Sequence, residues 1–311
     1  MTLVSILLPV YNTERYIART ITSLLEQTYR DIEIIVINDG STDNTEKEIL
    51  AIKDARVKYY AQENQGLSRT PNRAFSLSNG EYVARMDADD LAFPEKIEKQ
   101  VRYLEQHPDV SMVGTWAEIW VGDTRTSRFH RHPTDDLMIK LEMLFNNPFV
   151  HSTVLMRREA FAAIGGYSEN PEDYPEDYEL LVRITERFRV ANIPEILSVY
   201  RELPDSVCRK DARGPRKVPR GLARIAARNI ARLIGDTVAP ERVLSFTHAI
   251  HKISLSEGSD DSTACYTRIA KEIYGSFVRK YSVDGILRLK IAQRAGHYLF
   301  KAYANYYRKR I

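Results

Sequence analysis

The stretch E-Y-V-A-R-M-D-A-D-D, residues 81–90, decides the fold prediction. Its first half is apolar and favours extended structure, and it ends abruptly in Asp87, Asp89 and Asp90. A strand buried in a parallel sheet has a continuous apolar run of this kind. Ligands of open α/β sheets bind at the carboxyl ends of such strands. Two carboxylates one residue apart can hold a divalent cation, which in turn holds a diphosphate. An acidic surface turn is an equally good interpretation of D-A-D alone.

The sequence on both sides of this stretch alternates between extended and helical patterns. Continuous apolar runs predict strands over residues 4–9, 32–37, 57–60 and 82–86. Apolar residues at helical spacing predict helices between them, over residues 13–27, 43–52 and 67–77. This order predicts parallel strands joined by right-handed crossovers. The carboxyl ends carry Tyr11, Asp39 and Asp87, and we therefore expect these three residues around one crevice.

The rest of the chain predicts a second half of the domain and a helical extension. Helices are expected over 94–106, 135–146 and 176–188, strands over 110–114, 150–156 and 190–200, and a hairpin over 116–128. We predict a Rossmann-like α/β domain, residues 1–203, with a mostly parallel central sheet and helices on both faces. This domain divides near residue 115 into a first half and a second half, 116–203. A basic C-terminal region, 204–311, follows; it begins with a Pro- and Gly-containing linker over about 203–218 and is predicted to be helical from about residue 219.

Charge is distributed unevenly along the chain. Residues 1–200 carry 22 Lys and Arg against 32 Asp and Glu, and residues 201–311 carry 23 against 10, for a net charge of +3. The acidic part suits a metal, and the basic part suits an anionic surface. Two separated cysteines, Cys208 and Cys265, are typical of a reduced compartment. With no apolar run of about 18 residues and no signal-peptide pattern, we predict a cytoplasmic protein.

Several candidate site residues have two interpretations when each is taken alone. Asp39 can accept from an imide N–H such as that of uracil, or it can close an Asx-type turn. Tyr11 can stack on a base, or it can lie at the edge of the core. Gly66 permits a close backbone approach but is also an ordinary loop glycine. Asp177, at the start of a helix beside Glu176, is either a general base or a helix cap.

Taken together, the motifs resemble glycosyltransferase family 2, the inverting nucleotide-sugar enzymes with the GT-A fold. The matching stretches, in family order, are S-I-L-L-P-V-Y-N (5–12), V-I-N-D-G-S-T-D (36–43), N-Q-G-L-S-R-T-P-N (64–72), R-M-D-A-D-D (85–90), H-S-T-V-L-M-R-R (151–158), G-G-Y (165–167) and E-D-Y-E-L (176–180). The resemblance implies a metal-dependent hexosyltransferase with a nucleotide-binding half, about 1–115, and an acceptor-side half, about 116–203. Such an enzyme uses a nucleotide-sugar donor, expected to be UDP-linked, and a saccharide or lipid-linked saccharide acceptor.

The resemblance also implies roles for individual residues. Asp89 matches the ligand of Mg²⁺ or Mn²⁺, and Asp177 matches the catalytic base. The donor-binding positions are Pro9, Val10, Tyr11, Glu14, Asp39, Asn64, Gly66, Arg69, Asn72, Asp87 and Ala88. One departure concerns the family pattern Tyr-Arg-x-His, because this chain has Leu203 at the histidine position. His151 is a candidate substitute, and a structural histidine is the alternative.

The basic C-terminal region predicts a second contact surface. Arg220, Arg224, Arg228 and Arg232 recur every four residues, and the last helix interleaves cations with aromatic residues. These residues form either a solvated basic face or a surface that contacts the anionic inner face of the cell membrane. Nucleic-acid binding has no further support. Two other functions stay open, a sugar nucleotidyltransferase and a non-catalytic nucleotide-binding module. A sugar nucleotidyltransferase should carry a Gly-rich loop after its first strand, and this chain has no such loop there. The intact Asp87, Asp89 and Asp177 argue against a non-catalytic module.

Overall fold

The structure is a computed structural model that describes residues 2–203, 217–251 and 263–307. Its contacts form two compact units. The first unit comprises Met1–Asp136, Pro148–Asn170 and Arg183–Ser206, and the second comprises Leu137–Asn147, Pro171–Val182 and Val207–Ile311. Each unit therefore combines segments that are far apart in the sequence. The domain boundary expected at residue 203 stays a prediction.

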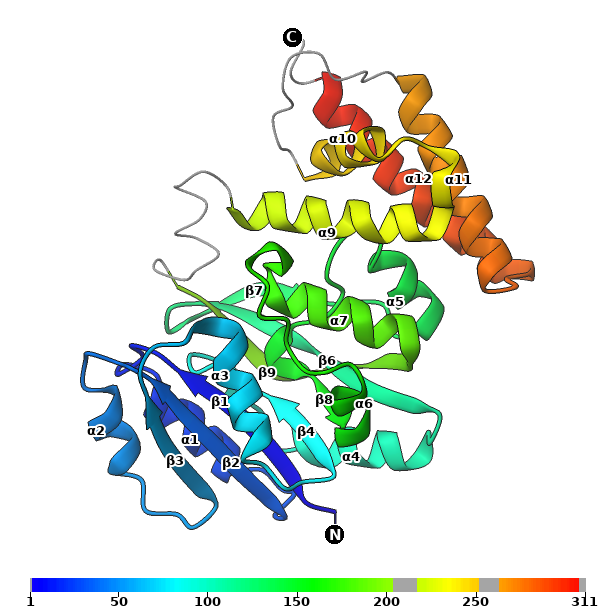
Figure 1. The fold of residues 1–311 in the computed structure, drawn as a ribbon. Coiled ribbons are helices and arrows are strands. Elements are labelled where there is room, and N and C mark those ends of the chain that lie inside the picture. Colours follow the sequence, from blue (N-terminus) through cyan, green and yellow to red (C-terminus); the bar gives the residue numbers. More distant parts are fainter. Residues whose placement is uncertain (1, 204–216, 252–262, 308–311) are drawn as a thin grey trace. The chain divides into compact units, whose positions relative to one another are not determined.

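Four parallel strands form the first half of the sheet in the first unit (Figure 1). In spatial order they are β3 (Val57–Gln62), β2 (Ile32–Asp39), β1 (Val4–Val10) and β4 (Tyr82–Arg85). The helices that connect them in sequence are α1 (Ile17–Leu25), α2 (Thr45–Leu50) and α3 (Gly66–Ser76). The predicted alternation and the parallel pairing are confirmed. Because the strands are parallel, their carboxyl ends lie at the same edge of the sheet.

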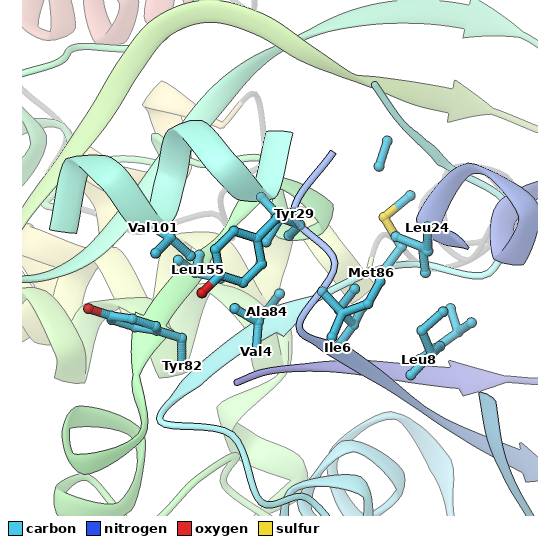
Figure 2. Packing of buried hydrophobic residues seen from close by; sticks show 14 of the residues in the cluster. Val4, Ile6, Leu8, Leu24, Tyr29, Tyr82, Ala84, Met86, Val101 and Leu155 are labelled. Carbon is cyan, nitrogen blue, oxygen red and sulfur yellow. The ribbon is translucent and has the colours of Figure 1, made fainter. Parts of the chain in front are cut away.

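The core of this half is built from alternate side chains of the strands. Val4, Ile6 and Leu8 of β1 are no more than 1% exposed and cluster with apolar residues of α1 and α4 (Lys96–Gln106). Met86, the apolar residue just before Asp87, lies close to Ile6 and Leu24 (Figure 2). Alternation turns the intervening side chains to the opposite face, where α3 lies against β1 and β2. Helices therefore cover both faces, as predicted.

The second half of the sheet is mixed. β8 (Leu155–Arg157) pairs antiparallel with β4 and with β6 (Val110–Val121), and β6 pairs parallel with β9 (Arg189–Glu202). Two short edge elements, β5 (Leu91–Ala92) and β7 (Thr124–His130), pair antiparallel with β9 and β6. The α/β fold class is confirmed, and the expectation of a mostly parallel sheet holds for the nucleotide-binding half.

Three local predictions differ from the structure. Residues 110–121 form one strand, β6, rather than a strand and half a hairpin, because β9 pairs along its whole length. Its turn falls at Gly122, with φ +58°, as predicted. The predicted strand over 150–156 begins instead as a 3-10 helix, η1 (His151–Thr153), where Thr153 Oγ1 donates to the Val150 carbonyl at 2.7 Å. Such side-chain bonds compete with strand pairing. Helix α5 (Asp136–Glu142) is shorter than expected and continues as turns.

The second unit has its own helical core. Its helices are α9 (Lys217–Ile234), α10 (Pro240–Ile250), α11 (Thr263–Lys280) and α12 (Gly285–Tyr307), with the short turn η3 (Gly235–Thr237). Buried residues of these helices, such as Ile230, Phe246 and Ile273, cluster with Phe145 after α5. The predicted helical region is confirmed where it is described, whereas Cys208 and most of the linker fall outside the described residues. Among the described helices, none has the length and apolar character needed to cross a membrane.

Candidate active site

The three predicted loops meet at the carboxyl edge of the parallel strands in the first unit. Val10 at the end of β1 pairs with Asn38 in β2, and Leu7 in β1 pairs with Arg85 at the end of β4. The segments that follow these residues therefore leave the sheet at one edge. Tyr11 is 51% exposed there, while Val10 is buried and contributes its side chain to the core. An aromatic ring in this position is free to stack on a base.

Asp87 is compensated by charges and hydrogen bonds from its neighbours. Its Oδ1 pairs with Arg85 at 2.7 Å, and its Oδ2 accepts from the Ser152 hydroxyl at 2.8 Å. Burial alone would raise the pKa of Asp87. The charges of Arg85 and His151, with the hydrogen bond from Ser152, instead hold that pKa below its usual range. Asp87 is therefore ionised and fixed in place at neutral pH.

Asp90 is the buried member of the acidic stretch, at 1% exposure. Its Oδ1 accepts from the Arg201 backbone N–H at 2.7 Å, and its Oδ2 lies within hydrogen-bonding distance of the Ser152 hydroxyl. Burial and the charges of Asp89 and Asp87 raise the pKa of Asp90 well above its usual range. Ser152 has one hydroxyl proton for two carboxylates. A neutral Asp90 that donates to Ser152, which then donates to Asp87, resolves this conflict.

Two buried cations, Lys96 and Arg201, donate hydrogen bonds to backbone carbonyls in and around the acidic loop. Lys96 is 1% exposed, its Nζ donates to the Ser152 carbonyl, and burial lowers its pKa to about 8. Arg201 is 2% exposed; its Nε donates to the Gly122 carbonyl at 2.8 Å, and another guanidinium nitrogen donates to the Asp89 carbonyl. The Arg201 guanidinium also lies 4.7 Å from the centre of the Tyr16 ring. These contacts fix the backbone of the acidic loop, and none of them is an ion pair with the Asp89 carboxylate.

Asp89 differs from its two neighbours. Among the described residues, no ion pair involves its carboxylate and no side chain donates a hydrogen bond to it. Burial and the charge of Asp87 raise the pKa of Asp89 to about 6. A carboxylate with excess negative charge beside it is the donor that a hard divalent cation prefers. Mg²⁺ is commonly bound by one or two carboxylates and completed by substrate phosphates, so these residues fit the predicted cation. Within the described part of the chain, no cluster of three metal-ligating side chains is present.

Asp39 has a structural task at the end of β2. It is 4% exposed, its Oδ1 accepts from Gln62 Nε2 at 2.6 Å and from the Gln65 N–H at 2.8 Å, and its Oδ2 accepts from the Gly66 N–H at 2.9 Å. These last two donors begin α3, so Asp39 caps that helix from another element. Gly66 has φ +85°, which glycine adopts without strain. The carboxylate thereby holds the loop that contains Asn64 and Gly66 at the sheet edge.

Asp39→Asn is expected to destabilise the protein by about 1–3 kcal/mol, because the amide keeps one acceptor and turns an N–H toward backbone donors. Urea unfolding measures the loss. Asp109→Asn is the control, since Asp109 forms an exposed pair with Arg189, and its cost should stay below about 1 kcal/mol. Equal stability of the two variants, with donor binding lost only in Asp39→Asn, would contradict the anchoring role.

Other predicted donor-binding residues connect loops to one another. Glu14 accepts from the Asn44 N–H at 2.7 Å and so ties the segment after Pro9 to the loop after β2. Arg69 forms an exposed pair with Glu169 at 2.8 Å. The amide of Asn72 both donates to and accepts from the backbone of Tyr167, at 2.9 and 2.8 Å. Glu14 and Asn72 thus position the site in this structure, and their contacts with a donor stay a prediction.

His151 connects this scaffold to the acidic loop. Its Nε2 lies 2.7 Å from the Tyr167 hydroxyl, and its charge contributes to the lowered pKa of Asp87. The bond to Tyr167 supports the structural interpretation of this histidine. Sequence reasoning missed Ser152, Lys96 and Arg201 as parts of the site. Ser152 belongs to the motif 151–158, and Arg201 is the arginine of the Tyr-Arg-x-His pattern. The sequence around Lys96 predicts only an ordinary helix residue.

Asp177 belongs to the second unit, in the first turn of α7 (Glu176–Arg187). Its Oδ2 accepts from Asn147 Nδ2 at 3.1 Å. The ring of Tyr178, the next residue, is fully buried and its hydroxyl donates to the Met143 carbonyl at 2.7 Å. This buried anchor fixes the start of α7 and therefore the direction of Asp177. Its role as the base stays a prediction.

The arginine stripe of α9 is partly neutralised within the second unit. Arg224 pairs with Glu172, and Arg228 pairs with Asp173 at 2.8 Å, both in the short 3-10 helix η2 (Pro171–Asp173). Of the aromatic residues expected to line the last basic helix, Tyr298 is 3% exposed and donates to Glu142. These residues stabilise the second unit, so the stripe as predicted is not a wholly solvated face.

Comparison with known proteins identifies the family of this chain. The profile described as "Glycosyl transferase family 2" matches residues 5–165, just over half of the 311 residues. An "Uncharacterized glycosyltransferase" of Haemophilus influenzae is 36% identical over 64% of this chain and 65% of its own length. "Putative glycosyltransferase EpsE" of Bacillus subtilis is 35% identical over 67% of this chain and 76% of its own. "Amylovoran biosynthesis glycosyltransferase AmsE" of Erwinia amylovora is 32% identical over 65% and 77%.

Solved structures share the fold at low identity. S. aureus TarS 1–349 in complex with UDP-GlcNAc has a TM-score of 0.61 at 16% identity, over 98% of this chain and 89% of that one. Mannosyltransferase PcManGT from Pyrobaculum calidifontis, in complex with GDP-Man and Mn²⁺, has a TM-score of 0.53 at 16% identity, over 97% and 86%. The profile match and the curated relatives show the family. The chain belongs to glycosyltransferase family 2.

Proposed function

We propose that this protein is an inverting, metal-dependent hexosyltransferase that moves a sugar from a nucleotide diphosphate sugar to an acceptor hydroxyl. The observation that carries the proposal is the state of the acidic loop. Asp87 and Asp90 are held by Arg85, Ser152 and the Arg201 backbone, while Asp89 alone keeps an uncompensated carboxylate at the edge of the sheet. A divalent cation with its diphosphate would supply the missing positive charge there.

The donor is proposed to be a UDP-sugar. TarS, a structure with the same fold, was solved with UDP-GlcNAc, whereas PcManGT was solved with GDP-Man. Tyr11, which is exposed at the end of β1, is the proposed stacking partner of the base. Asp39 and the backbone it holds at Gln65 and Gly66 form the proposed edge that reads the base. Uracil offers an imide N–H to such acceptors.

The cation is proposed to be Mg²⁺ or Mn²⁺, held by Asp89. When bound, it stabilises the negative charge that develops on the leaving diphosphate. The chain's own residues prepare this position. Arg201 fixes the Asp89 backbone, and Ser152 holds Asp87 and Asp90 so that neither carboxylate turns away from the loop. Asp87 is left to accept from hydroxyls of the ribose or the sugar.

The transfer step is proposed to use Asp177 as the general base. The acceptor oxygen forms a bond to C1 of the sugar while the bond from C1 to the diphosphate oxygen breaks. The bonding electron pair leaves with the diphosphate, and the acceptor proton moves to the Asp177 carboxylate. Attack from the face opposite the leaving group inverts the anomeric centre, so no covalent enzyme intermediate is required.

The acceptor is proposed to be a saccharide or a lipid-linked saccharide in the synthesis of a surface polysaccharide or glycolipid. The curated names support this class: AmsE is called an amylovoran biosynthesis glycosyltransferase. We further propose a cytoplasmic protein that contacts the anionic inner face of the cell membrane through its basic C-terminal helices. No nucleic acid is part of this proposal.

A nucleotide-sugar panel tests the proposed function. Thermal unfolding is measured with UDP-, GDP-, dTDP- and CMP-linked sugars, each with Mn²⁺ and with EDTA. A UDP-sugar at about 100 times its Kd should add about 2.7 kcal/mol of stability, which raises Tm by several degrees. The shift should vanish with EDTA, and the same donor should be hydrolysed slowly with Mn²⁺. A metal-independent shift, or one that is equal for all bases, would contradict the proposed donor site.

A further inference from the structure

Helix α12 is apolar on two faces, and only one of them is buried. Ile291, Ala295, Tyr298 and Ala302 are at most 6% exposed and belong to the core of the second unit. On another face, Ile286, Leu289 and Phe300 are 75%, 71% and 70% exposed. At 3.6 residues per turn these three side chains fall within an arc of about 60°. Scattered exposed apolar residues are ordinary, but three in one stripe, an arc that also contains the polar Gln293, favour a covering surface.

Basic residues follow one edge of this stripe. Lys290, His297 and Lys301 are exposed, and helical spacing places them in the arc adjoining Ile286 and Phe300. From Gly285 to Ile311 the sequence contains no Asp or Glu. A helix with an apolar stripe, a cationic flank and no acids has the residue pattern of helices that lie in the plane of a membrane interface.

A cavity opens beside the stripe. It has a volume of about 330 Å³ and is lined by Lys290, Gln293, Arg294 and His297 of α12 and by Met138 of α5. Arg294 also pairs with Glu142 of α5, which fixes its guanidinium at the cavity wall. The lining includes the cations Lys290 and Arg294 and the apolar side chain of Met138. It suits a phosphodiester headgroup attached to an apolar chain.

We propose that this face of α12 docks on an anionic phospholipid bilayer. Ile286, Leu289 and Phe300 enter the boundary of the acyl chains, Lys290 and Lys301 contact the headgroup phosphates, and the cavity holds one headgroup. The surface is thus α12 rather than the arginine stripe of α9, whose Arg224 and Arg228 already pair with acids. A second copy of this chain is a poorer occupant, because a twofold contact would bring the same cations together.

This inference deepens the proposed membrane contact, and it does not depend on the donor or on the transfer step. The full chain is floated with vesicles of phosphatidylcholine alone or with 30% phosphatidylglycerol. Only the anionic vesicles should carry the protein. Ile286→Gln/Leu289→Gln/Phe300→Gln should lower partitioning at least about tenfold. Leu50→Gln/Val121→Gln/Phe129→Gln removes three apolar side chains that are 46%, 38% and 38% exposed elsewhere, and should leave it unchanged.

The charge contribution is tested separately. Lys290→Gln/Lys301→Gln should lower partitioning about fivefold per lysine at low salt, whereas Lys47→Gln/Lys53→Gln, with the same change in net charge, should not. Insertion is read from Phe300→Trp, whose new indole should be quenched by lipids brominated in the acyl chain. Circular dichroism confirms that each variant is folded.

Three results would overturn the proposal. They are failure of the native chain to bind anionic vesicles, equal binding by the α12 triple variant and its control, and a solution dimer that only the α12 variant dissociates. Donor hydrolysis in solution is measured on the same preparations. Because that reaction needs no membrane, loss of hydrolysis contradicts the proposed function, while loss of flotation contradicts the docking surface.

Discussion

Asp89→Asn is expected to lower the transfer rate by about a thousandfold or more. The amide cannot supply the negative oxygen that holds the divalent cation, and the charge on the leaving diphosphate is then stabilised by several kcal/mol less. The thermal shift that a UDP-sugar produces with Mn²⁺ should also disappear. The measurement is initial transfer rate against Mn²⁺ concentration, with donor binding followed in parallel. Full activity without added metal would contradict the assignment.

The same variant is expected to be more stable than the native protein when metal is absent. The pKa of Asp89 is raised from 3.8 to about 6 in the folded protein, so folding favours the neutral acid. Its contribution to stability is therefore present below about pH 4 and is lost as pH rises through about 6. At pH 7.5 the ionised group costs about 1–3 kcal/mol, which the amide removes. Thermal unfolding in EDTA from pH 5 to 8 measures the difference.

Asp87→Asn is the matched control, because it makes the same change two residues away with the opposite expected sign. The pKa of Asp87 is lowered in the folded protein, and its carboxylate pairs with Arg85, whose side chain is 7% exposed. The amide should leave a buried guanidinium without its counter-ion and cost about 2 kcal/mol or more. If both variants lost stability in EDTA at pH 7.5, Asp89 would not be the uncompensated carboxylate.

Asp177→Asn is expected to lower the transfer rate by about 10²- to 10⁴-fold, the usual contribution of a general base. Donor affinity should change by less than about threefold, because the amide has nearly the shape of the acid and can still accept from Asn147. Single-turnover transfer and donor binding by calorimetry separate the two quantities. Transfer at the native rate would refute the base assignment.

Glu176→Gln is the control for helix capping. Glu176 and Asp177 both lie in the first turn of α7, and either change removes one negative charge from the same helix terminus. A capping or dipole effect is worth about 0.3–1 kcal/mol and should be similar for both. Only Asp177→Asn should lose transfer. Equal losses in the two variants would favour the capping interpretation for Asp177.

The order of strands and helices in the first half could be predicted from the sequence because its signals are local. Apolar runs of four to eight residues, helical spacing between them and acids at strand ends are properties of neighbouring residues. Parallel pairing follows from the crossovers, and it brings the segments after Val10, Asp39 and Arg85 to one edge. The strand predicted over 150–156 is wrong only in its first part: residues 151–153 form a 3-10 helix, in which the hydroxyls of Ser152 and Thr153 form other hydrogen bonds.

By itself the sequence therefore determined the fold class, the family and the identity of the acidic loop. Only the tertiary structure decided which acid in that loop has no side-chain hydrogen bond or ion pair among the described residues, namely Asp89. Ser152, 65 residues beyond Asp87, and Arg201, 111 residues beyond Asp90, provide the hydrogen bonds that distinguish these carboxylates from Asp89. Tertiary structure likewise decided that one apolar face of α12 is buried and another is exposed. The physical reason is that the pKa of a carboxylate and the burial of a side chain depend on groups a few ångströms away, and the folded chain brings those groups together from distant positions.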